Sequence, residues 1–268
     1  MIESIKNYNV YTQGMSKSYQ DKLFFLDKIN DVTGLVDFGC ADGTLIEHIA
    51  ERLPNVKLVG YDINQDMIQL AMEKVAMEKD KTCGLYTNDF NEAMHIINTD
   101  LSVLNLSSVI HEVYSYSMPY AINDFWNNVF NSGFQYIVIR DFCVSASVNR
   151  KADVNDWAKV IQKADVNQVT EYESIWGSIK ENRNLVHFLM KYRYVTNWER
   201  EVRENYFPIT LESLLSKIPT DKYEIIYFED YVLPFTANKI KEDFDIHLHD
   251  STHVKLLLKS KYNAKKLS

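Results

Sequence analysis

An acidic residue and two glycines stand close together in the segment Val36-Asp37-Phe38-Gly39-Cys40-Ala41-Asp42-Gly43. A short apolar run passes there into residues with helical apolar spacing, so the segment predicts a turn between a buried strand and a helix. Gly39 and Gly43 permit a tight turn and a close approach of a ligand to the backbone. The free N–H groups of a helix N-terminus favour an anion, so a carboxylate or phosphate of the ligand is expected there.

A second acid, Asp62, closes the next buried run and is placed to accept hydrogen bonds from a ribose diol. The pair of features fits a dinucleotide site or an S-adenosylmethionine site. A dinucleotide fingerprint reads G-x-G-x-x-G, whereas the spacing here is Asp-x-Gly-x-Ala-x-Gly, with the acid inside the strand. This version resembles the first motif of the class I S-adenosylmethionine-dependent methyltransferases, except that Ala41 stands where a glycine is commoner.

The resemblance covers roughly residues 30–141 and, weakly, the terminal strands, with further segments in the expected order. Residues 60–63 resemble the second motif, 87–90 the third, 104–112 the fourth, and 133–141 the segment of the fifth strand. The resemblance implies S-adenosylmethionine as cofactor and S-adenosylhomocysteine as product. It implies these cofactor-binding residues: Asp37, Gly39, Cys40, Ala41, Gly43, Asp62, Ile63, Met67, Asp89, Phe90 and Asn105.

In that family the second-motif acid binds the ribose hydroxyls, and the third-motif acid contacts the adenine amino group. The matching residues are Asp62 and Asp89, and Phe90 would pack on the adenine ring. Other readings stay open, because Asp62 could be a helix cap, Asp89 a turn residue and Phe90 a core residue.

His111 and Glu112 follow the fourth strand, at the sheet edge where open α/β sheets bind ligands. A histidine there can remove a proton from a hydroxyl nucleophile, and Glu112 can orient it or bind substrate. The alternative is that His111 caps a helix or packs beneath the cofactor. Both residues are the candidate catalytic residues.

A histidine-rich segment, His247, His249, Asp250 and His253, has residue types that suit metal ligands. The segment could also face the substrate, since the sixth strand ends at the cofactor edge of the sheet. A solvated loop between two strands is the favoured interpretation, so we predict no metal site.

Residues 187–194 interleave basic and aromatic side chains, a pattern that can bind single-stranded nucleic acid. Leu185, Phe188, Leu189 and Tyr192 also have the helical spacing of a core, and the core interpretation is favoured. Ahead of the first strand, Tyr11, Met15 or Tyr19 could line the cofactor site or lie on a surface helix.

Alternating apolar runs and helical stretches predict an α/β fold of the Rossmann-like type, with a mainly parallel seven-stranded sheet. The last two strands, 223–232 and 252–258, have few residues between them, which predicts an antiparallel terminal hairpin without a crossover helix. We expect one domain, 1–268, made of an N-terminal helical segment (1–30), a cofactor-binding core (31–141), a helical cap inserted after strand five (142–221) and terminal strands completing the sheet (222–268).

The chain has 268 residues, a net charge of −8 and three cysteines without a CxxC pair. The charge favours small or neutral acceptors over nucleic acid. The cysteines fit a reduced, cytoplasmic protein. No signal peptide or apolar membrane span is visible, and nothing indicates the oligomeric state.

We therefore expect methyl transfer from S-adenosylmethionine to an oxygen or nitrogen of a small molecule. The alternatives are an RNA or protein methyltransferase that uses the insert as its docking surface, and a non-catalytic cofactor-binding module.

Overall fold

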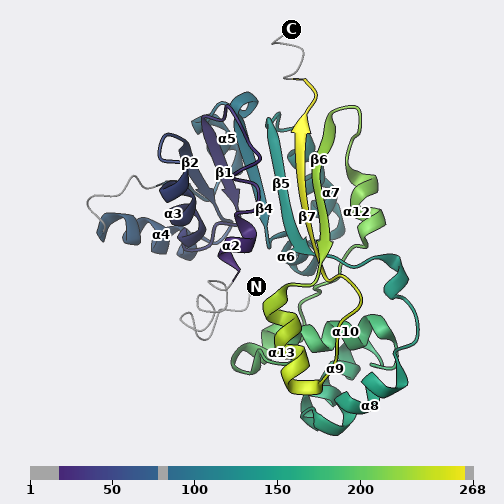
Figure 1. Cartoon of the computed structure of the whole chain (residues 1–268). Helices are drawn as coiled ribbons and strands as arrows, with labels where there is room; N and C mark the ends of the chain where they lie inside the picture. Colours follow the sequence, from purple (N-terminus) through teal and green to yellow (C-terminus); the bar gives the residue numbers. More distant parts are fainter. Residues whose placement is uncertain (1–17, 78–83, 263–268) are drawn as a thin grey trace.

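The computed structural model describes residues 18–77 and 84–262. Its centre is one seven-stranded sheet (Figure 1). The strands are β1 (Gly34–Phe38), β2 (Lys57–Tyr61), β3 (Leu85–Thr87), β4 (Ser102–Ser107), β5 (Tyr136–Phe142), β6 (Tyr223–Tyr231) and β7 (His253–Ser260).

The strand order is β3-β2-β1-β4-β5-β7-β6, and β1 to β5 pair in parallel. β7 is antiparallel to both β5 and β6, so β6 runs in the same direction as the parallel strands. The predicted fold class, Rossmann-like with antiparallel terminal strands, is confirmed. Since the strand order reverses between β1 and β4, a ligand site is expected at their carboxyl ends.

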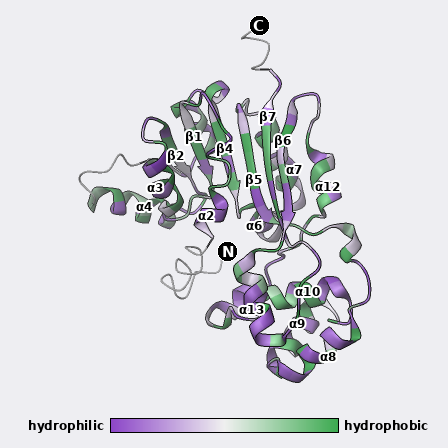
Figure 2. Ribbon diagram, in the orientation of Figure 1, coloured by the Kyte–Doolittle hydropathy of each residue, from purple (hydrophilic) through white to green (hydrophobic). Residues whose placement is uncertain are grey.

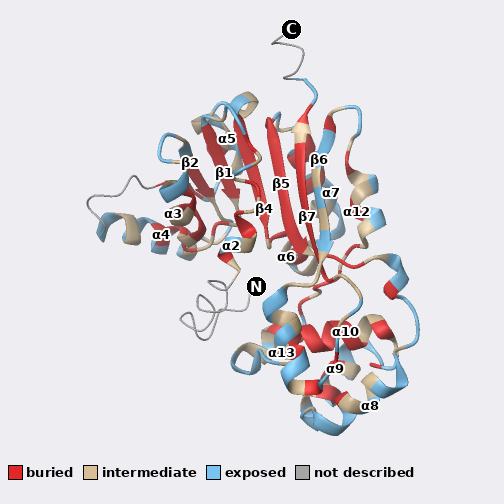
Figure 3. Ribbon diagram, in the orientation of Figure 1, coloured by how far each residue is buried: buried red, intermediate tan, exposed pale blue. Residues whose placement is uncertain are grey.

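Successive residues of a strand face opposite sides of the sheet, and each side is covered by helices. Val36 packs with the apolar side chains of α5 (Phe90–Ile96), α6 (Ile110–Tyr116) and α7 (Pro119–Asn131). Leu35 packs on the other side with α3 (Thr44–Arg52), α4 (Gln65–Met77) and the segment before β1. Figure 3 shows the inner strands buried between partly exposed helices, while β6 at the edge of the sheet is largely exposed.

The segment between β5 and β6 is helical, and it lies beyond the carboxyl ends of the parallel strands except for its last helix, which packs against the sheet (Figure 1). Its helices are α8 (Val154–Lys163), α9 (Val166–Trp176), α10 (Asn182–Lys191), α11 (Trp198–Glu201) and α12 (Leu211–Lys217). Short 3-10 helices span Thr99–Leu101, Ala146–Val148 and Val195–Asn197. We call residues 142–221 the cap, and Figure 2 shows hydrophilic and hydrophobic residues interspersed along its helices. A hydrophobic cluster separate from those of the sheet holds the cap together, apart from α12.

The prediction that β6 and β7 are joined without a helix is wrong, because α13 (Pro234–Phe244) lies between them. Ile240 and Phe244 of α13 are buried in the hydrophobic cluster of the cap. The connection therefore leaves the sheet, contributes a helix to the cap and returns in the antiparallel direction.

The N-terminal helical segment expected over 1–30 also needs correction. Within its described part only α2 (Tyr19–Lys22) is helical, and turns follow as far as Lys28. α7 begins at Pro119, with Met118 as its N-cap. In the described residues no helix is long and apolar enough to cross a membrane.

Candidate active site

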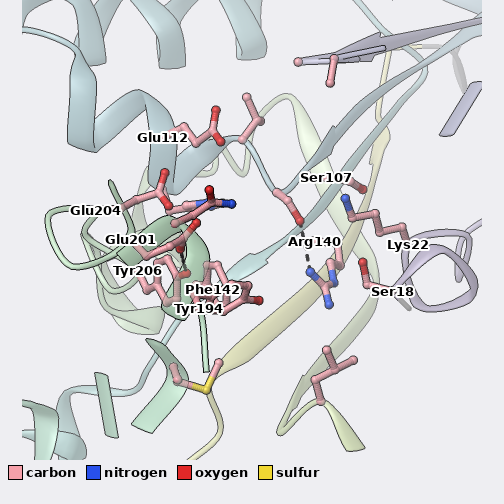
Figure 4. A pocket seen from close by; sticks show the side chains of 18 of the residues that line it. Ser18, Lys22, Ser107, Glu112, Arg140, Phe142, Tyr194, Glu201, Glu204 and Tyr206 are labelled. Atoms are coloured by element: carbon pink, nitrogen blue, oxygen red, sulfur yellow. Dashed lines mark hydrogen bonds between the residues drawn. The ribbon is translucent and has the colours of Figure 1, made fainter. Parts of the chain in front are cut away.

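A cavity of about 890 Å³ lies between the carboxyl ends of the parallel strands and the cap. Asp37 comes from the end of β1, Asp62 follows β2, and Ser107 ends β4. The opposite wall comes from the cap, from residues such as Met190, Glu204 and Tyr206 of its 189–206 stretch, and from α13 (Figure 4). The volume is near the upper end of the roughly 300–1,000 Å³ of small-molecule sites.

The turn after β1 is held to the neighbouring strand by backbone hydrogen bonds. The N–H groups of Gly39 and Cys40 donate to the carbonyl of Tyr61, over 2.7 and 3.0 Å. Gly43 has a φ of +77°, and a Cβ there would lie 2.5 Å from the Tyr86 hydroxyl oxygen, so glycine is required. The predicted glycine turn is therefore present, and it is fixed by β2 and β3 as well as by its own sequence.

The helix N-terminus behind this turn is already occupied by an acid of the chain. Asp42 Oδ1 accepts from the N–H and hydroxyl of Thr44, at 3.2 and 2.8 Å, and Asp42 also pairs with Lys74. The expected ligand anion at this N-terminus thus competes with a protein carboxylate.

Ala41 and Asp62 connect the turn to the end of β2. The N–H of Ala41 donates to Asp62 Oδ2 at 2.9 Å, and that of Asn64 donates to Oδ1 at 2.8 Å. Ala41 has a φ of +46°, in the left-handed region, which costs an alanine about 1–2 kcal/mol. The departure from the family's glycine is tolerated at this cost, and Asp62 keeps its carboxylate at the cavity wall.

An apolar surface lies beside Asp62. Ile63 is 74% exposed and lines the cavity together with Met67 and Cys40. This arrangement suits an adenosine, because the carboxylate can bind the ribose hydroxyls while the adenine ring packs on the exposed apolar side chain. Burial raises the pKa of the Cys40 thiol, so Cys40 acts here as a small apolar wall residue.

Asp37 and Asn105 form a buried pair across β1 and β4. Asn105 Nδ2 donates to Asp37 Oδ1 at 2.7 Å, and Ser107 donates to Asn105 Oδ1 at 2.8 Å. Burial raises the pKa of Asp37 to about 6. Asp37 lines the cavity, whereas Asn105 lies behind it and positions the carboxyl.

Asp89 and Phe90 lie outside the residues that line the cavity. Asp89 is exposed and caps α5, with its Oδ1 accepting from the Asn91 N–H at 2.8 Å. Phe90 packs edge-on against Phe38, at 5.1 Å between ring centroids. In this structure Asp89 caps a helix and Phe90 packs against another ring. Neither residue reaches the cavity, so the cavity does not support their predicted contacts with adenine.

We expect Asp89→Asn to leave the affinity for S-adenosylhomocysteine within about threefold of the native value. Asparagine caps a helix as well as aspartate does, so stability is expected to change by less than about 0.5 kcal/mol. Calorimetric titration and urea unfolding measure the two quantities. A large loss of affinity with unchanged stability would instead place the carboxylate on the adenine amino group.

His111 is buried at the start of α6, and its Nδ1 lies 2.5 Å from Asp141 Oδ1. Burial alone would lower its pKa, but Asp141 and the nearby glutamates outweigh this and raise the pKa to about 9. Asp141 also accepts from the N–H groups of Ile110 and Phe142, both at 2.7 Å. The imidazole is thus fixed in orientation and held protonated at neutral pH.

Glu112 and Glu204 lie beside His111, and Arg200 joins them. Arg200 Nη2 is 2.9 Å from Glu112 Oε1 and 3.4 Å from Glu204 Oε1. Glu204 is buried, and burial, partly offset by His111 and Arg200, raises its pKa to about 7. The predicted pair His111 and Glu112 is brought together, with two cap residues that the sequence analysis did not identify.

These three acceptor groups, His111, Glu112 and Glu204, lie within 4.8 Å of one another, a spacing that could hold a metal ion. Arg200 already pairs with both glutamates, which argues for a cluster of charged side chains and against a metal site here. Among the described residues, the side chains of the histidine-rich segment do not lie close enough together to form a group of three possible metal ligands. His253 is buried in β7 beside Thr252, and Asp250 pairs with Arg150 at 2.7 Å.

The basic and aromatic segment of the cap is mostly interior, as the core interpretation predicts. His187 to Lys191 are all buried. His187 Nδ1 pairs with the Tyr172 hydroxyl at 2.8 Å, and Lys191 donates to the carbonyls of Glu201 and Glu204. Lys191 therefore fixes the loop that carries Glu204. Tyr19 lines the cavity, while Tyr11 and Met15 lie outside the described residues.

We next compared the chain with known protein families and solved structures. Residues 36–125 match the family model described as a methyltransferase domain. The matched part, about a third of the chain, is a methyltransferase domain. The cofactor that this match implies is S-adenosylmethionine, which the turn after β1, Asp62 and the apolar surface of Ile63 fit. No curated protein matches the chain.

Three solved structures share the fold of the methyltransferase. PKMT2 from Rickettsia typhi has 11% identity and a TM-score of 0.51, over 92% of this chain and 53% of PKMT2. A protein solved in work on converting a disulfide bond into a thioacetal during echinomycin biosynthesis has 12% identity and a TM-score of 0.50, over 93% and 84%. The [4+2]-cyclase SpnF has 11% identity and a TM-score of 0.50, over 90% and 81%.

Proposed function

We propose that the methyltransferase transfers the methyl group of S-adenosylmethionine to an oxygen or nitrogen of a small molecule bound beneath the cap. When bound, the cofactor supplies an electrophilic methyl group on a sulfonium. The chain binds both reactants in one cavity and holds them in line, which accounts for much of the rate enhancement in such displacements. Asp62 and the turn after β1 hold the cofactor, and the cap covers the acceptor.

The observation that carries this proposal is the cluster of Glu204, His111, Glu112 and Arg200 on the cavity wall. A carboxyl whose pKa is about 7 can take a proton from a hydroxyl or an ammonium near neutral pH. We assign the role of base to Glu204, because His111 already carries its proton there. His111 and Arg200 then stabilise the Glu204 carboxylate, and Glu112 holds Arg200 in place.

A small acceptor fits the volume of the cavity and the interior position of the cap's aromatic side chains. One of the structural neighbours comes from work on echinomycin biosynthesis, and another is named a [4+2]-cyclase. Since one is named a cyclase, the fold alone does not decide the reaction, and the test must detect methyl transfer itself.

The test is incubation with methyl-labelled S-adenosylmethionine and a panel of small molecules that carry hydroxyl and amino groups. We expect labelled product and S-adenosylhomocysteine in equal amounts. In Glu204→Gln the turnover is expected to fall about 10²- to 10⁴-fold, the usual contribution of a positioned base, with unchanged cofactor affinity. Label that enters only RNA or protein would contradict a small acceptor, and binding without turnover would indicate a cofactor-binding module.

A further inference from the structure

Lys22, at the end of α2, carries a buried ammonium that points into the cavity. Lys22 is 3% exposed, and its side chain lines the cavity beside Ser18 and Ser107 (Figure 4). Among the residues that the structure describes, none forms a hydrogen bond or ion pair with its Nζ. A buried charge without a partner is costly, so a partner from outside the chain is expected.

The carboxylates whose charge acts on Lys22 all bond to other groups. Asp37 accepts from Asn105, Asp141 pairs with His111, and Glu112 pairs with Arg200. None of these carboxylates forms a hydrogen bond or ion pair with the ammonium, and each acts on it only through its charge. The described part of the chain therefore places negative charges near Lys22, but none of these carboxylates bonds to it directly.

Arg140 adds positive charge to the same side of the cavity. Its guanidinium is buried, pairs with Asp21 at 2.7 Å and donates to the Ser108 hydroxyl at 3.2 Å. Burial and this neighbouring cation lower the pKa of Lys22 to about 8, so the ammonium is still mostly charged at neutral pH. An anion bound here would gain from both charges.

We propose that Lys22 binds the carboxylate of the methionyl part of S-adenosylmethionine. The inference rests on the proposed function, in that the cavity must take this cofactor, and it deepens the account of that site. The cofactor carries a single carboxylate, at the end remote from adenosine. Asp62 follows β2, whereas the charged neighbours of Lys22 lie on β1, α6 and β5, so Lys22 lines a different part of the cavity from Asp62.

The test compares two ligands in Lys22→Met, an uncharged side chain of similar length. One ligand is S-adenosylhomocysteine, and the other is its decarboxylated analogue, S-adenosyl-3-thiopropylamine, which keeps the amine. Calorimetric titration is expected to show a loss of about 10- to 100-fold for S-adenosylhomocysteine, the worth of a charge-assisted hydrogen bond. The affinity for the analogue is expected to stay within threefold.

Two control variants complete the design. Lys22→Arg keeps the charge and is expected to retain most of the affinity. Lys57→Met removes the same charge from an exposed position at the start of β2 and is expected to change nothing. Without ligand, Lys22→Met is expected to unfold at the same or a higher temperature than the native protein, because it removes an unpaired buried charge.

Native affinity for S-adenosylhomocysteine in Lys22→Met would overturn the inference, as would an equal loss for both ligands, which indicates a structural role. A native protein that binds neither ligand would instead contradict the proposed function.

Discussion

Replacing Asp62 by alanine is expected to lower the affinity for S-adenosylhomocysteine by about 100-fold or more. Hydrogen bonds to a charged acceptor are each worth about 1.5–3 kcal/mol, two of them would join a ribose diol to the carboxylate, and each 1.4 kcal/mol is tenfold. The change also frees the N–H groups of Ala41 and Asn64, which both donate to Asp62. The turn after β1 would thus lose its tie to β2.

Matched variants separate these two contributions in the same calorimetric titration. Asp62→Asn keeps one carbonyl oxygen and the side-chain shape, and is expected to lose about tenfold. Asp66→Ala removes an equal charge from the exposed rim of the same cavity and is expected to have no effect on affinity. If Asp62→Ala binds S-adenosylhomocysteine as well as the native chain, the assignment of the cofactor site is wrong.

The strands and the turn after β1 could be predicted from the sequence because their signals are local. The apolar runs are short and bounded, and the pattern of Asp37, Gly39 and Gly43 lies within one strand–turn–helix unit. The position of Asp62 follows from the same logic, since it ends the next strand. In a parallel sheet such neighbouring strands end at one edge, so local signals were enough to place the cofactor side.

The acceptor side depends on contacts that no local pattern contains. Glu204 meets His111 only because Lys191, ten and thirteen positions before the carbonyls it binds, fixes the intervening loop. Asp141 was included in the fifth-strand segment, yet its bond to His111 joins residues 30 positions apart. α13 was missed because its apolar residues are few, and two of them, Ile240 and Phe244, gain their partners only in the folded cap.

The pair of His111 and Asp141 is expected to give the protein a stability that falls with rising pH. The pKa of His111 is about 9 in the folded protein, against an ordinary 6.5. A raised folded pKa adds stability that is complete below pH 6.5 and is lost as the pH rises through 9. At 1.36 kcal/mol for each unit, the loss over this window is about 3 kcal/mol.

Lys22, Lys191 and Glu204 also titrate in this window, so the measurement must be a difference. In urea unfolding at pH 6, His111→Gln is expected to be about 3–5 kcal/mol less stable than the native protein, because Asp141 keeps a buried charge without its partner. By pH 9.5 the difference in the free energy of unfolding between the native protein and His111→Gln is expected to narrow by about 3 kcal/mol. Adding Asp141→Asn to His111→Gln is expected to recover part of the loss at pH 6, since no charge is then left buried.

A constant difference between native protein and His111→Gln from pH 6 to 9.5 would mean that His111 is neutral in the folded protein. The imidazole would then be free to accept a proton, and the role of base would pass from Glu204 to His111. The stability measurement therefore discriminates between the two bases before any acceptor is known, because only a neutral imidazole can take the proton that methyl transfer releases.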